Sequence, residues 1–189
     1  RGAFSGRAVI AVKARQRVPS IVLHARDLKA QQVRLHSGSQ RRLLRVAAEG
    51  RSATWRLTPI DGRPIAAGEH RLVINYSGRI NRSGEGLYRA DHRVGDKGRR
   101  RPATMLATQL QAVHARTLFP GWDEPLFRAV FDIDVTAPQG YEVLSNQPLA
   151  KREAVRGGVR HRFAATPSMP SYLLALAVGQ FDVLEDNSG

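Results

Sequence analysis

Cysteine is absent from this chain of 189 residues. Disulfide bonds and thiolate metal ligands are therefore excluded, and cysteine usage does not indicate a compartment. Long apolar runs are missing too, since the longest, Tyr172 to Val178, is far shorter than the roughly 20 residues that cross a bilayer. The first residues also lack the charged-then-apolar pattern of a signal peptide. We therefore expect no transmembrane segment, and both cytoplasm and periplasm stay open as compartments.

Lysine is scarce, with only four among 30 basic residues, although the formal net charge is +14. Such a charge is compatible with a nucleic-acid partner. A preference for arginine also follows from a GC-rich coding sequence, however, and most of these arginines are scattered singly. Scattered charges are typical of a solvated surface. We therefore expect no nucleic-acid partner.

Catalytic motifs are missing as well. None of the six histidines belongs to the His-Glu-x-x-His pattern of a zinc peptidase, and no Gly-x-Ser-x-Gly motif offers a serine nucleophile. Asp132 and Asp134 share the polar side of a predicted strand, which favours surface carboxylates over a catalytic pair. We expect no catalytic residue, no metal ligand and no unaided hydrolysis in these residues.

Short β-prone segments dominate what is present, and Gly, Pro, Ser and Asp separate them. These segments lie at residues 7–14, 21–25, 32–36, 42–47, 54–58, 71–78, 141–145, 151–156 and 159–164. Turns are predicted at residues 37–40 and at the Gly157-Gly158 pair, which indicates a hairpin tip. Because no long helical period intervenes, the sequence predicts an all-β fold, a saddle-like antiparallel β-sandwich of many short strands with little helix.

Three further segments give local predictions. Phe127 to Val135 alternates most cleanly and predicts one amphipathic strand, whereas the apolar run from Tyr172 to Val178 predicts a strand covered on both sides. Asp91 to Arg101 is rich in Gly and charged residues and predicts a flexible surface loop. We expect one domain over residues 1–183, with residues 184–189 as the start of a linker.

Residues 103–127 contain the most unusual polar pattern. A strand over residues 104–111 places Gln109 and Gln111 on one side and Leu106 and Leu110 on the other. Two carboxamides on one strand face are suited to hold a ligand or partner through donors and acceptors. Alternatively, the two amides satisfy backbone groups at a seam between domains.

A compact turn follows this strand. It contains two prolines, Pro120 and Pro125, which prevent a continuing helix or central strand, and the large ring of Trp122 anchors it. We expect Arg116 to pair with one of the two acids of the turn. The residues given this structural role are Arg116, Pro120, Trp122, Asp123, Glu124 and Pro125.

The segment TQLQAVHARTLFPGWDEP, residues 108–125, resembles the end of the N-terminal domain in zinc aminopeptidases of the aminopeptidase N family. Its Gln-Ala-x-His-x-Arg wording is most similar to the leukotriene-epoxide hydrolase branch. Further matching stretches occur in the same order at residues 21–28, 86–89 and 166–181. Together they span about residues 7 to 183, nearly the whole chain.

The resemblance implies a peptidase whose zinc site lies in a following catalytic domain, against which this domain packs. It also implies that Gln111 helps to hold the substrate's free α-amino group and that Gln109 lies near the first side-chain pocket. Fixing the amine in this way would restrict cleavage to the first peptide bond. The partners implied are the chain's own catalytic domain and the N-terminus of a peptide.

Three positions depart from the family pattern. Gly121 replaces the usual cysteine, and His114 stands where an acid is common, although the epoxide-hydrolase branch has His. Gln111 replaces a glutamate, so it offers an ammonium group a dipole rather than a charge. A second interpretation, from another class, is a non-catalytic β-sandwich module that binds carbohydrate or an anionic partner.

Overall fold

The computed structural model describes residues 2–95 and 101–181. Its strands are antiparallel, and its only helical elements in these residues are two 3-10 turns, η1 (Ala115–Thr117) and η2 (Ser171–Leu173). The predicted all-β antiparallel sandwich with little helix is therefore confirmed. No helix in the described residues is long and apolar enough to cross a membrane.

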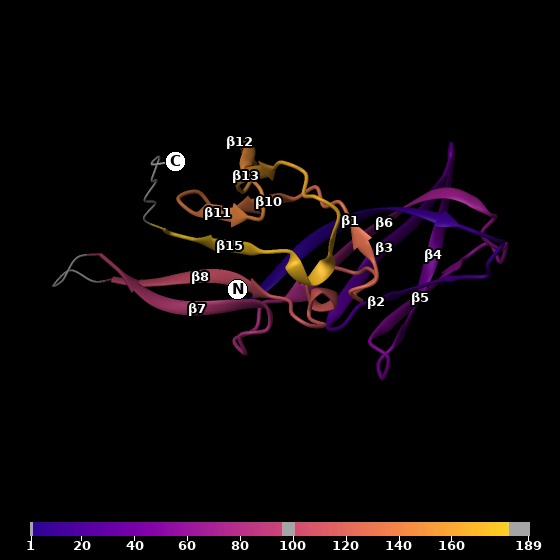
Figure 1. Ribbon diagram of the computed structural model, residues 1–189, viewed down its shortest axis with the longest axis horizontal. Coiled ribbons are helices and arrows are strands. Elements are labelled where there is room, and N and C mark those ends of the chain that lie inside the picture. Colours follow the sequence, from indigo (N-terminus) through magenta and orange to yellow (C-terminus); the bar gives the residue numbers. More distant parts are fainter. Residues whose placement is uncertain (1, 96–100, 182–189) are drawn as a thin grey trace.

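The first six strands form a curled sheet with the order β1-β6-β3-β4-β5-β2 (Figure 1). They are β1 (Ala3–Ala14), β2 (Ile21–His24), β3 (Leu28–Ser37), β4 (Gln40–Glu49), β5 (Thr54–Pro59) and β6 (Gly68–Arg79). The first half of β4 pairs with β3 and its second half pairs with β5. Strand β4 therefore connects two layers, β1-β6-β3 and β5-β2.

The core of this unit comes from alternate residues of its strands. Leu35, Leu57 and Ile74 are fully buried between the layers, and Trp55 is 3% exposed. Their neighbours along each strand are exposed or half-buried apart from Val73, which is 7% exposed, because successive side chains of a strand point to opposite faces. Burying each large aliphatic side chain contributes about 1.5–3 kcal/mol.

A second sheet of four strands has the order β11-β15-β8-β7. Its strands are β7 (Gly86–Val94), β8 (Arg101–Gln109), β11 (Glu142–Ser145) and β15 (Leu176–Gly179). In Figure 1 the β7–β8 hairpin extends away from the six-stranded sheet, and β15 runs beside β8. A three-stranded sheet of β10 (Asp134–Ala137), β13 (Gly158–Phe163) and β12 (Leu149–Val155) and a short pair, β9 (Arg128–Ala129) with β14 (Met169–Pro170), complete the fold.

Both predicted turns are confirmed. Ser37 pairs with Gln40 across the β3–β4 turn, where Gly38 has a φ of 58°. Val155 pairs with Gly158 across the β12–β13 hairpin. These sequence signals are local, since a positive φ favours glycine wherever the rest of the chain lies.

Three local predictions are wrong in whole or in part. Phe127 to Val135 is not one strand, since only its ends belong to β9 and β10. The run from Tyr172 to Val178 begins in η2 and becomes a strand only at Leu176. Within the predicted loop Asp91 to Arg101, residues 91–94 continue β7 and residue 101 begins β8. Pairing between β7 and β8 decides this, and charge composition does not reveal such pairing. Residues 96–100 and the expected linker, residues 184–189, lie outside the described residues.

Candidate functional site

Strand β8 ends at Gln109, so the prediction that Gln109 and Gln111 share one strand face is wrong. Leu110 leaves the strand and is 1% exposed, and its carbonyl accepts a hydrogen bond from the His114 N–H at 2.9 Å. Burial of this side chain and closure of the turn end the strand two residues before the predicted end at Gln111. Gln111 therefore lies in the turn that follows the strand.

Both glutamine side chains are exposed. Gln109 is opposite Gly86 in the β7–β8 register. Thr108, one residue earlier, connects β8 to β15, because its hydroxyl accepts a hydrogen bond from the Leu176 N–H at 2.8 Å. The Gln109 carboxamide thus extends from a firmly paired strand end.

The turn after the strand docks on β2. His24 and Gly121 exchange backbone hydrogen bonds of 2.7 and 3.0 Å, and the Arg26 N–H donates to the Arg116 carbonyl at 2.8 Å. The turn therefore extends β2 like a short additional strand. This pairing connects the end of β8 to the six-stranded sheet.

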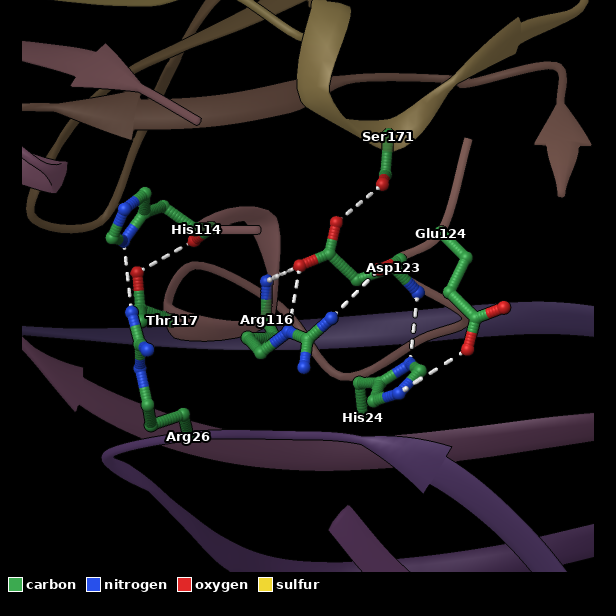
Figure 2. A network of polar contacts seen from close by, with 8 residues as sticks. All are labelled: His24, Arg26, His114, Arg116, Thr117, Asp123, Glu124 and Ser171. Atoms are coloured by element: carbon green, nitrogen blue, oxygen red, sulfur yellow. Dashed lines mark hydrogen bonds and ion pairs between the residues drawn. The ribbon is translucent and has the colours of Figure 1, made fainter. Parts of the chain in front are cut away.

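Asp123 is the centre of the polar network in Figure 2 and is 3% exposed. Its carboxylate accepts hydrogen bonds from Arg116 Nε at 2.9 Å, from the Arg116 backbone N–H at 3.1 Å and from Ser171 Oγ at 2.7 Å. Its backbone carbonyl accepts from Arg116 Nη2 at 2.7 Å. A buried carboxylate is tolerated only with such compensation. Of the two acids in the turn, Asp123 is thus the partner of Arg116.

His24 connects the same network to β2. Its Nδ1 accepts a hydrogen bond from the Asp123 N–H at 3.2 Å, and its Nε2 lies 3.7 Å from Glu124 Oε1 (Figure 2). Burial is the main cause that lowers the pKa of His24, and the nearby Arg116 guanidinium lowers it further. The neutral ring therefore fits this position, because an acceptor Nδ1 carries no proton.

The remaining turn residues divide between the core and the surface. Pro120 is fully buried, and Trp122 packs against the core of the six-stranded unit. The Trp122 ring also lies 6.5 Å from the ring of Phe127 between centroids. Glu124 and Pro125 are exposed. The turn is therefore anchored to the core by Trp122 and Asp123, and Glu124 and Pro125 face the solvent.

On its other side the turn borders a hollow of about 680 Å³ whose lining includes Arg26, Asn81, Glu85 and His114. Arg26 Nη2 donates to His114 Nδ1 at 2.8 Å, and His114 Nε2 lies 3.6 Å from Glu85 Oε2. Neither glutamine lines this hollow. Gln109 and Gln111 thus lie outside this hollow, on the open surface.

No sequence pattern predicts a role for His24, Arg26 or Ser171. His24 and Ser171 lie within matching stretches, but neither residue has a distinctive neighbour that would indicate a contact with Asp123. These contacts join positions 99 and 48 residues apart in the chain. Such long-range pairs follow from topology and are not visible in local patterns.

Residues 1–173 match the family model described as the peptidase M1 N-terminal domain. The chain belongs to this family.

Its relatives in the family are named as aminopeptidases. The chain is 41% identical to aminopeptidase N of Acetobacter pasteurianus over 61% of its length and 32% of the relative. It is 30% identical to aminopeptidase M1-D of Oryza sativa subsp. japonica over 96% of its length and 20% of the relative. With human endoplasmic reticulum aminopeptidase 1 it shares 29% identity over 95% of its length and 19% of the relative. The chain thus spans between about a fifth and a third of these relatives.

The described residues contain no group of three or more His, Asp or Glu side chains placed to hold a metal ion. The M1 aminopeptidase family suggests a metal, generally zinc, in a full enzyme. Gln109 and Gln111 offer exposed carboxamides, which can donate and accept hydrogen bonds.

Proposed function

We propose that this chain is the N-terminal domain of a zinc aminopeptidase and that Gln111 helps to bind the α-amino group of the peptide substrate. The observation that supports this role is the position of Gln111. It is exposed in a turn that buried residues hold on both sides, Leu110 before it and Ala115 after it. A carboxamide oxygen in such a position can accept a hydrogen bond from an ammonium group.

The domain would act together with a catalytic domain. The open surface around the glutamines supports this arrangement, because one neutral amide in water gives an ammonium little net binding energy. A catalytic domain that covers this edge would exclude water and strengthen the same contact. Gln109, at the end of β8, would then lie beside the first side-chain pocket.

The zinc ion would be held by the catalytic domain, where it would activate water for attack on the first peptide bond. This chain's part is positioning. Fixing the amine sets the distance from the N-terminus to the reacting carbonyl, so that a single terminal residue is removed.

Zinc analysis and peptidase assays on the full-length gene product test this proposal. We expect a bound zinc ion and release of single N-terminal residues, and we expect the isolated chain to release none. A full-length product without zinc and without peptidase activity would contradict the proposal. Binding of carbohydrate or of an anionic partner by that same product would then favour the binding-module alternative.

A further inference from the structure

One face of the six-stranded unit carries positive charge that the sequence does not reveal as a cluster. The outer side of the β1-β6-β3 layer, together with the first half of β4, is defined by the register of the strands. Seven exposed basic residues from four strands lie on it. They are Arg7, Lys13, Lys29, Arg34, Arg41, Arg71 and Arg79.

The strand register sets these residues in rows across the sheet. One row consists of the successive partners Ala11, Arg71, His36 and Arg41. The neighbouring row on this face consists of Val9, Val73, Arg34 and Leu43. Neighbouring strands lie about 4.8 Å apart. The charges are therefore spread over an area, not along a line.

Few acidic side chains on this face offset the charge of these basic residues. Glu69, opposite Lys13, is the only acidic residue on this face of the layer. None of the seven basic residues has an ion-pair partner within 4.0 Å among residues 2–95 and 101–181. Seven cations and one anion leave a net charge of about +6, which favours association with a surface of opposite charge.

The apolar and aromatic content of the face favours one class of partner. Val9 is 52% exposed and Leu43 is 49% exposed, and both lie in the row that contains Arg34. Aliphatic side chains among cations can enter the interface of a membrane. No aromatic side chain lies on this face, although aromatic rings are the usual platform for single-stranded nucleic acid.

We propose that the outer face of the β1-β6-β3 layer binds the phosphate-rich surface of an anionic lipid membrane. A second copy of the chain is a poor occupant, because two such faces would repel each other. The proposal does not depend on peptidase activity, since the face uses strands other than β8 and the turn of Gln111.

Co-sedimentation of the full-length protein with vesicles tests the proposal. The vesicles contain phosphatidylglycerol mixed with phosphatidylcholine, or phosphatidylcholine alone. We expect binding to the anionic vesicles only, weakening as salt is raised. Absence of binding to anionic vesicles at low salt would overturn the proposal.

Charge-removing variants locate the binding face. Arg34→Gln with Arg71→Gln removes two cations from the face, and we expect binding about tenfold weaker or more. Arg51→Gln with Arg63→Gln removes two exposed arginines from connections between strands of the six-stranded unit and should change binding less than twofold. Equal losses in the two pairs would overturn the assignment.

A second pair and two competitors complete the test. Arg7→Gln with Lys29→Gln removes charge from other rows of the face, so a similar loss is expected even if the first pair perturbs folding. Duplex DNA and inorganic phosphate, added as competitors, should displace the protein from vesicles only weakly. Tighter binding to DNA than to the vesicles would indicate a nucleic-acid partner for this face and overturn the proposal.

Discussion

Asp123 and Ser171 lie 48 residues apart in the chain, and the serine hydroxyl donates a 2.7 Å hydrogen bond to the buried carboxylate. The same carboxylate accepts from Arg116. Three parts of the fold therefore meet at one ion: η1, the proline-bracketed turn and η2. The position of Gln111 depends on this junction, because Gln111 lies at the start of the segment that leads through η1 to Asp123.

The first prediction concerns this buried ion. Asp123→Asn should lower the free energy of unfolding by about 3 kcal/mol or more, because it leaves the guanidinium of Arg116 without its charged partner. Asp134→Asn is the matched control. Asp134 pairs with Arg160 at the surface, where both side chains are about 40% exposed, and such pairs contribute less than about 1 kcal/mol. Urea unfolding measures both, and equal losses would contradict the assigned role of Asp123.

The second prediction concerns pH. Because burial and Arg116 lower the pKa of His24 in the folded chain, the unfolded chain binds more protons between that lowered pKa and the ordinary value near 6.5. This residue's contribution to stability is complete above about pH 7. The contribution declines as the pH falls from there to the folded-state pKa of His24. Below that pKa it no longer changes with pH.

His24→Asn isolates this contribution, since its side-chain oxygen can replace Nδ1 as an acceptor but does not titrate. Urea unfolding of both proteins between pH 8 and pH 5 is the measurement. We expect the difference in unfolding free energy, natural chain minus variant, to decrease as the pH falls. Parallel curves would show that His24 is not held neutral by the fold.

The third prediction concerns the register of the strand end. Gly86 has a φ of 65°, and a Cβ added there would overlap the hydroxyl of Thr117. Gly86→Ala should therefore cost about 2–4 kcal/mol, combining the positive φ with the overlap. Gly84→Ala is the control, since Gly84 has a φ of 81° but open space around its Cα, and it should cost about 1 kcal/mol. Equal losses in thermal or urea unfolding would exclude the contact with Thr117.

Much of the fold could be predicted from the sequence because its strands follow local rules. Trp55 and Leu57 alternate with exposed neighbours, and glycines mark the turns at Gly38 and Gly157. The predictions failed where pairing with a distant strand decided the structure. Alternation alone carried the predicted strand past Gln109, whereas burial of Leu110 ends it.

The candidate site was predicted less completely. The pairing of Arg116 within the turn involves positions seven apart, a distance at which charge patterns are informative. The contacts of Asp123 with His24 and Ser171 join segments that only the folded topology brings together. The basic face has the same origin, because arginines that are isolated along the chain become neighbours across β1, β6 and β3.

If Gln111 binds the substrate's α-amino group, as we propose, its loss should change the KM of the full-length enzyme for aminoacyl substrates. A hydrogen bond to a charged group contributes about 1.5–3 kcal/mol, so Gln111→Ala should raise KM about tenfold or more. Gln111→Glu should lower KM, because it restores a charge opposite the ammonium. Gln40→Ala, an exposed glutamine at the β3–β4 turn, should leave KM unchanged. Unaltered KM in both Gln111 variants, with zinc content and folding intact, would contradict the account.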